Sequence, residues 1–155
     1  MIVADTNLVV YLFVESEFTE RARQVHSLDS DWVFPPIAQS EAANVLATLT
    51  REKWITPETA CEALEHIEKR IMAGLRNVSM RAALELAIRK EISAYDAQFI
   101  VLAHSLDVHL ITEDGRLKNK FPEVALSMAA FAARNKDWTL RETRTAYGAR
   151  RKKSK

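Results

Sequence analysis

Residues 1–7 read Met1-Ile2-Val3-Ala4-Asp5-Thr6-Asn7, and this order of residue types indicates the fold class of the chain. Its first residues are apolar and predict a short buried strand that ends at an aspartate. The later stretch His109-Leu110-Ile111-Thr112, followed closely by Asp114, has the same order. The carboxyl ends of parallel strands meet at one edge of an open α/β sheet, and ligands bind in the crevice there. We therefore expect Asp5 and Asp114 to lie close together.

Strand-like and helix-like segments alternate along the rest of the chain, which is typical of a mostly parallel sheet covered by helices. The sequence predicts one α/β domain whose central sheet has about five strands. The expected strands cover residues 1–4, 32–34, 77–79, 108–111 and 124–127. The expected helices cover residues 7–14, 17–28, 38–52, 57–72, 80–90 and 95–106. A turn is expected at residues 113–115.

Two further acids begin helices near the same edge. Glu41 lies one turn before Val45 at the rim of a buried stripe, and Asp96 lies on the first turn of the most apolar helix. Carboxylate oxygens without thiolate or imidazole partners favour Mg²⁺ or Mn²⁺ over zinc. His104 and His109 are five residues apart across an expected helix end, which disfavours a zinc pair. If the four acids meet, they form a divalent-cation site.

Each acid also has an ordinary interpretation. Asp5 could cap a helix, and Asp96 could belong to a capping box that starts at Ser93. Asp114 before Gly115 could mark only a turn, and Glu41 could be an acid favoured by the helix dipole. On spacing alone, a shared site and four separate roles are both open.

Composition fits one ordinary globular domain, with 48% hydrophobic and 28% charged residues in 155. The only cysteine, Cys61, can form no internal disulfide, which favours a reducing compartment, and we expect a cytoplasmic protein. No apolar run approaches the roughly 18 residues of a membrane span, so no membrane association is expected. Three glycines cannot supply a phosphate-binding glycine-rich loop.

Four motifs together resemble the PIN-domain ribonucleases and, more narrowly, the VapC toxins of toxin–antitoxin pairs. They lie at residues 3–7, 40–46, 93–97 and 110–117. The resemblance implies a PIN-like nuclease domain at residues 1–133, followed by a C-terminal extension with a basic tail at 134–155. Carried over position by position, it assigns catalysis and metal binding to an acidic quartet of Asp5, Glu41, Asp96 and Asp114. Polar support is expected from Thr6, Asn7, Ser93 and Thr112.

The resemblance also implies an activity and partners. We expect a metal-dependent endoribonuclease that hydrolyses RNA with water activated by Mg²⁺ or Mn²⁺, leaving a 5′ phosphate and a 3′ hydroxyl. Arg116, Lys118 and Lys120 are candidate contacts for RNA phosphates, although each could simply be solvated. Phosphate contacts do not read sequence, so transfer, ribosomal and messenger RNA are all open as substrates. A small antitoxin that blocks the acids and a homodimer are expected as partners.

The charge distribution and two rival functions complete the expectations. Residues 150–155 carry five positive charges, so the rest of the chain has a net charge of −4 against +1 for the whole. Such a tail is either a solvated end or a nucleic-acid contact.

A phosphatase that uses aspartate would need Asp-x-Asp after the first strand, and this chain has Asp5-Thr6-Asn7. A non-catalytic interaction module that keeps the fold is the other alternative.

Overall fold

A four-stranded parallel sheet forms the centre of the molecule, in the order β2-β1-β3-β4. The strands are β1 (Ile2–Ala4), β2 (Trp32–Val33), β3 (Leu110–Ile111) and β4 (Ala125–Leu126). This computed structural model describes residues 1–135, so all but the first two positions of the expected C-terminal extension lie outside the described residues. The expected α/β class is confirmed, with a sheet of four strands.

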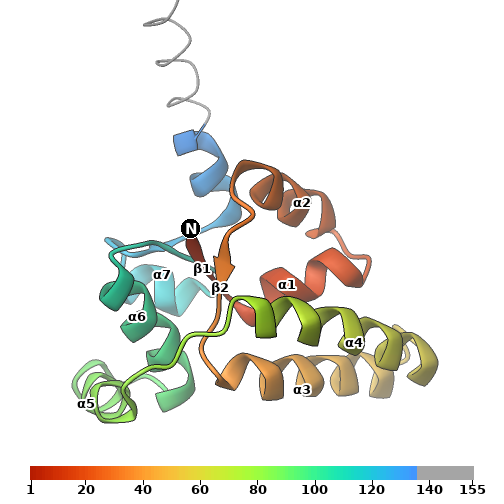
Figure 1. The fold of residues 1–155 in the computed structure, drawn as a ribbon, viewed down its shortest axis with the longest axis horizontal. Helices are drawn as coiled ribbons and strands as arrows, with labels where there is room; N and C mark the ends of the chain where they lie inside the picture. The colour runs from red at the N-terminus through yellow and green to blue at the C-terminus, as the bar shows by residue number, and fades with distance from the viewer. Residues whose placement is uncertain (136–155) are drawn as a thin grey trace, which may run out of the picture.

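Helices flank the sheet and connect its parallel strands (Figure 1). Helix α1 packs against α2, α3 and α4, whereas α6 packs against α5, β1 and β3. None of the helices within residues 1–135 combines the length and the apolar character needed to cross a membrane. The bounds are α1 (Thr6–Phe13), α2 (Thr19–Leu28), α3 (Ile37–Arg51), α4 (Pro57–Ala73), α5 (Met80–Lys90), α6 (Ala94–Leu106) and α7 (Gly115–Lys120), and residues 128–135 are also helical.

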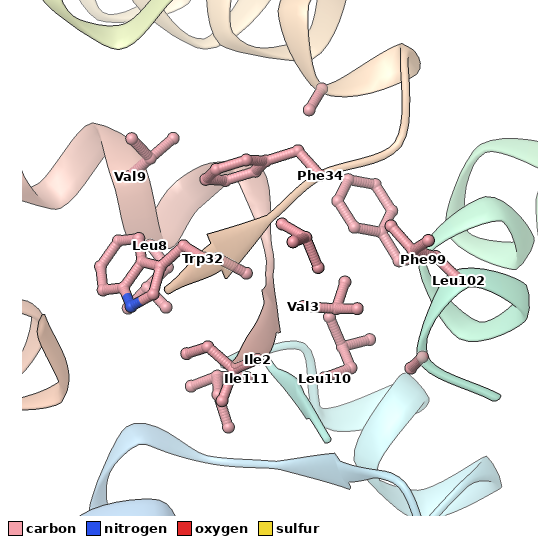
Figure 2. Packing of buried hydrophobic residues seen from close by; sticks show 14 of the residues in the cluster. Ile2, Val3, Leu8, Val9, Trp32, Phe34, Phe99, Leu102, Leu110 and Ile111 are labelled. Carbon is pink, nitrogen blue, oxygen red and sulfur yellow. The ribbon is translucent and has the colours of Figure 1, made fainter. Parts of the chain in front are cut away.

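The hydrophobic core lies on both sides of β1, because a parallel strand between two layers of helices is buried on both faces. Figure 2 shows Leu8 and Val9 of α1 on one side of Val3 and Phe99 and Leu102 of α6 on the other. All five side chains are buried. Burial of one such side chain contributes about 1.5–3 kcal/mol to stability, so these contacts fix the position of α1 and α6 on the sheet.

The expected strand at residues 77–79 is wrong, because the chain is irregular there. On the side of β2 away from β1, the pairing within residues 1–135 is one bridge between Phe34 and Leu75. The Phe34 amide donates to the Gly74 carbonyl at 3.0 Å. A Cβ on Gly74 would lie 2.0 Å from the carbonyl oxygen of Trp32, so only glycine allows the chain to approach β2 this closely.

Candidate active site

The four predicted acids line one cleft of about 240 Å³ at the carboxyl edge of the sheet. Strand β1 lies between β2 and β3. The chain adds β2 on one side of β1 and then adds β3 and β4 on the other side, so the strand order reverses at β1. In open α/β sheets such a switch point opens a crevice beyond the strand ends. The residues that line the cleft are Asp5, Thr6, Asn7, Glu41, Asn44, Val45, Asp96, Phe99, Asp114 and Leu117.

Asp5 follows β1 directly and caps helix α1. Its Oδ1 accepts the amide hydrogen of Asn7 at 3.0 Å, and its Oδ2 accepts the hydroxyl hydrogen of Thr112 at 2.5 Å. Burial raises the pKa of Asp5 against these two hydrogen bonds, and the charges of Asp114 and Asp96 raise it further. The capping interpretation of Asp5 is therefore correct, and the same carboxylate also faces the cleft.

Thr112 joins the ends of β1 and β3 from inside the protein. Its side chain is only 2% exposed. The hydroxyl that donates to Asp5 also accepts the amide hydrogen of Asp114 at 3.0 Å. One buried hydroxyl thus fixes the carboxylate of Asp5 and the start of the segment that carries Asp114.

Glu41 reaches the cleft from the second turn of α3. The Thr6 hydroxyl donates to its Oε2 at 2.6 Å. Burial raises the pKa of Glu41, the Thr6 hydrogen bond opposes this, and the charges of Asp5 and Asp96 add to the rise. Because α3 has no acid in its first turn, the helix-dipole interpretation of Glu41 is wrong.

Asp96 and Asp114 occupy the other side of the cleft. Ser93 caps α6 by accepting the Asp96 amide hydrogen at 2.9 Å, which leaves the Asp96 side chain on the first helical turn. Asp114 caps α7 by accepting the amide hydrogens of Arg116 at 2.7 Å and Leu117 at 3.3 Å. Helix α7 was missed from sequence, since Asp114-Gly115 predicted only a turn.

Arg116 supplies positive charge on this side. Its Nη2 lies 3.4 Å from Asp114 Oδ2 and 3.7 Å from Asp96 Oδ2. Burial alone would raise the pKa of Asp114, but the amides of Arg116 and Leu117 and the Arg116 guanidinium outweigh it and lower that pKa. The two sides of the cleft therefore stabilise their carboxylates differently.

Lys118 and Lys120, the other two candidate RNA contacts, bind protein groups outside the acidic quartet. Lys118 Nζ lies 3.2 Å from Glu113 Oε2. Lys120 Nζ donates to the main-chain carbonyls of Lys90 at 2.6 Å and Glu91 at 3.0 Å. Contact of Lys118 or Lys120 with RNA stays a prediction.

The donor set of the cleft fits a hydrated Mg²⁺ or Mn²⁺ ion. Its ligand atoms are oxygens, and the lining residues within 1–135 include neither cysteine nor histidine. Within residues 1–135 no three acidic, histidine or cysteine side chains converge to hold one ion directly. Mg²⁺ usually keeps several waters and takes one or two carboxylates, so direct contact with all four acids is not required. The volume of about 240 Å³ leaves room for those waters, each of which occupies about 30 Å³ in the liquid.

Asn44 is the polar lining residue that sequence reasoning did not select. It lies three residues after Glu41 on α3, and side chains with this spacing share a helix face. The spacing from Glu41 was the signal that could have found it. Phe99 and Leu117 form apolar walls of the same cleft.

Comparisons with known proteins identify the family of this chain. The PIN domain family matches residues 2–121. The chain belongs to the PIN-domain family. Ribonuclease VapC3 of Pyrobaculum aerophilum is 27% identical to this PIN-domain chain over 124 residues, covering 78% of this chain and 95% of that protein. The resemblance to PIN-domain ribonucleases, and more narrowly to VapC proteins, is confirmed.

A solved structure shows the same fold. The crystal structure of PAE2754 from Pyrobaculum aerophilum matches this PIN domain with a TM-score of 0.69 and 16% sequence identity. The match covers 88% of this chain and 89% of that one. At this identity the likeness concerns the fold alone.

Proposed function

We propose that this PIN-domain protein is a metal-dependent endoribonuclease and the toxin of a toxin–antitoxin pair. The observation that carries the proposal is the meeting of Asp5, Glu41, Asp96 and Asp114 in one cleft at the sheet edge. The similarity to Ribonuclease VapC3 over most of both chains supports it. The substrate is RNA, and the bond that breaks is a phosphodiester.

The four acids have separate proposed roles. Asp5 and Asp96 would hold a Mg²⁺ or Mn²⁺ ion directly, while Asp114 and Glu41 would act through water. A carboxylate offers about four lone-pair positions, so Asp5 keeps capacity for a ligand beside its bonds to Asn7 and Thr112. When bound, the cation neutralises charge on a phosphoryl oxygen and lowers the pKa of a coordinated water.

The residues of the chain supply position and orientation. Thr112 and the Asn7 amide hold the Asp5 carboxylate, and Thr6 holds Glu41 so that it can orient the attacking water. Phe99 and Leu117 give the cleft apolar walls beside the acids. Attack in line with the leaving 3′ oxygen leaves a 5′ phosphate and a 3′ hydroxyl.

An apolar groove on the protein surface supports the proposed antitoxin partner. It has a volume of about 440 Å³ and lies between α3 and α4. An amphipathic segment can bind such a groove through its apolar face. Trp54, in the connection between these helices, is 75% exposed and offers an aromatic contact. The groove is lined by Ala43, Leu46, Ala47, Thr50, Arg51, Pro57, Ala60, Cys61 and Leu64. A homodimer is proposed as well, without assignment of its surface.

A non-catalytic module is the rival that a structural observation favours, because Asp5 and Asp114 cap helices whether or not they hold metal. The phosphatase alternative lacks its second acid. Asn7 occupies that position in the cleft. Asp96 separates enzyme from module best, since Ser93 caps α6 in its place and a change at Asp96 leaves the cap intact.

The test is cleavage of a mixed RNA pool by purified protein with Mg²⁺ or Mn²⁺, compared with EDTA. Asp96→Asn should lower the rate by about a hundredfold or more, because a charge that helps to hold the metal is lost. Asp31→Asn, at an exposed aspartate outside the cleft, is the matched control and should cut like wild type. Equal cleavage by wild type and Asp96→Asn, or by wild type in metal and in EDTA, would contradict the proposal.

A further inference from the structure

Arg116 forms ion pairs with two acids of the cleft, Asp96 and Asp114. Among residues 1–135, it forms the ion pairs recorded for Asp96 and Asp114, at 3.7 and 3.4 Å. Its main-chain amide is fixed by Asp114 Oδ1 at 2.7 Å, so the base of the side chain cannot move away. The guanidinium end is different, because 75% of the side chain is exposed.

The guanidinium of Arg116 and a divalent cation compete for the carboxylates of Asp96 and Asp114. An exposed ion pair on a long side chain contributes little free energy, since the chain loses rotamer entropy and solvent screens the charges. A divalent ion carries twice the charge and binds several oxygens at once. The weaker of the two partners, the guanidinium, should therefore be the one that leaves.

Resting on the metal site of the proposed function, we infer that Arg116 is an exchangeable counter-ion of the cleft. It pairs with Asp96 and Asp114 in the metal-free protein, releases them when a divalent cation binds, and then contacts a phosphate of the nucleic acid. Its anchored main chain keeps the released guanidinium at the rim of the same cleft. Guanidinium groups bind phosphate oxygens through paired hydrogen bonds, so a released Arg116 suits that second role.

This exchange makes metal binding and nucleic-acid binding cooperate. Without metal, Arg116 is occupied by carboxylates and contributes little to holding a phosphate. With metal, the same side chain is available at the point where the backbone enters the cleft. Lys118 and Lys120 do not replace it, since Glu113 and two main-chain carbonyls hold them.

The first test is Mn²⁺ binding by isothermal titration calorimetry. Arg116→Gln removes the competing charge and should bind Mn²⁺ about threefold to tenfold more tightly than wild type. Arg81→Gln is the matched control, because Arg81 is an exposed arginine paired with one acid, Glu85, at 2.8 Å on α5. It makes the same change in net charge and should bind Mn²⁺ as wild type does. Arg116→Lys keeps the charge and should lie between the two.

The second test measures the cooperation directly. A labelled single-stranded DNA oligonucleotide serves as the phosphate probe, its affinity is measured by fluorescence anisotropy, and a gel checks that it stays intact. Wild type and Arg116→Gln should bind it almost equally in EDTA. With Mn²⁺, wild type should bind about threefold to tenfold more tightly than Arg116→Gln, as expected for the loss of one phosphate contact.

The outcomes separate this inference from the proposed function. If Arg116→Gln and wild type bind Mn²⁺ equally, or differ in oligonucleotide affinity by the same factor with and without Mn²⁺, the exchange is wrong and the metal site stands. If wild type binds no Mn²⁺, both the exchange and the metal-dependent function are wrong. Tighter Mn²⁺ binding by Arg116→Gln together with a metal-dependent gap in oligonucleotide affinity supports the exchange.

Discussion

The two sides of the acidic cleft hold the same kind of group in opposite ways. On the β1–α3 side, Asp5 and Glu41 are held by the buried hydroxyls of Thr112 and Thr6, and burial raises the pKa of both acids. On the α6–α7 side, the exposed Arg116 pairs with the carboxylates of Asp96 and Asp114. On one side, groups in the core hold the carboxylates. On the other side, an exposed cation at the surface balances their charge.

This difference separates rigidity from adaptability within one site. Hydroxyls that are packed in the core fix the directions of the Asp5 and Glu41 oxygens but cannot cancel their charge. A flexible guanidinium cancels charge and can leave when another cation arrives. Changes on the first side should therefore alter stability and geometry, and changes on the second should alter charge balance.

The largest effect is expected from Thr112→Val, which removes the hydroxyl and keeps the shape. Asp5 loses a donor and the Asp114 amide loses its acceptor, which should cost about 1–3 kcal/mol of unfolding free energy. RNA cleavage should fall by about tenfold to a hundredfold, as for residues that orient metal ligands. Urea unfolding and cleavage rates measure the two effects.

Thr6→Val is the matched change on the same side of the cleft. It removes one hydrogen bond, to Glu41, whereas Thr112→Val removes two, so both of its effects should be smaller. Wild-type cleavage by Thr112→Val would show that the buried hydroxyls do not position the acids.

A smaller effect is expected from Asp5→Asn in EDTA. Because the pKa of Asp5 is raised above its ordinary value of 3.8 in the folded state, the folded protein binds more protons than the unfolded chain as the pH rises past that value. Stability should therefore fall as the pH rises through this window. Asparagine can still cap α1, so the variant should lack this fall and melt at a higher temperature than wild type at neutral pH.

The lowered pKa of Asp114 makes stability depend on pH in the opposite direction. It is lowered, so its contribution to stability is present above 3.8 and is lost as the pH falls through the lower folded-state value. Thermal melts of wild type and Asp5→Asn from pH 3 to 8 measure both trends, because this range spans the carboxylate titrations at about pH 4. Millimolar Mg²⁺ should raise the melting temperature of wild type more than that of Asp5→Asn. Identical pH profiles for wild type and Asp5→Asn would contradict the raised pKa of Asp5.

The smallest effect is expected from Lys120→Gln. Lys120 donates to the carbonyls of Lys90 and Glu91 at the end of α5, where a positive charge is favoured by the helix dipole. Its loss should cost about 0.3–1 kcal/mol of stability and leave oligonucleotide affinity nearly unchanged. If affinity falls as far as in Arg116→Gln while the melting temperature is unchanged, Lys120 binds phosphate as the sequence first indicated.

The main frame of the fold was predictable because its signals are local. The apolar runs that end at Asp5 and near Asp114 became β1 and β3, and the apolar helix after Ser93 became α6. Their pairing in parallel follows from the helices between them. The positions of the acids at strand ends and helix starts left a shared cleft and four separate roles both open, and the resemblance to PIN-domain ribonucleases assigned the four acids to one site.

The features that were missed depend on contacts across the chain. Residues 77–79 lacked a partner, because pairing beside β2 stops at Leu75. Helix α7 begins at Gly115, a residue that predicts turns when sequence is considered alone. The double role of Thr112 and the ion pairs of Arg116 depend on side-chain positions in space. Spacing along a sequence does not contain this information.

The bridge between Phe34 and Leu75 has a further consequence for the behaviour of the protein in a crowded solution. An open strand edge presents main-chain groups that a second molecule can pair with, which leads to aggregation. Here the Phe34 amide and carbonyl are satisfied within the same copy by Gly74 and Arg76. The close approach that glycine allows therefore protects the main-chain groups of Phe34 from pairing with another molecule. Local opening around Gly74 would expose these groups and allow that pairing.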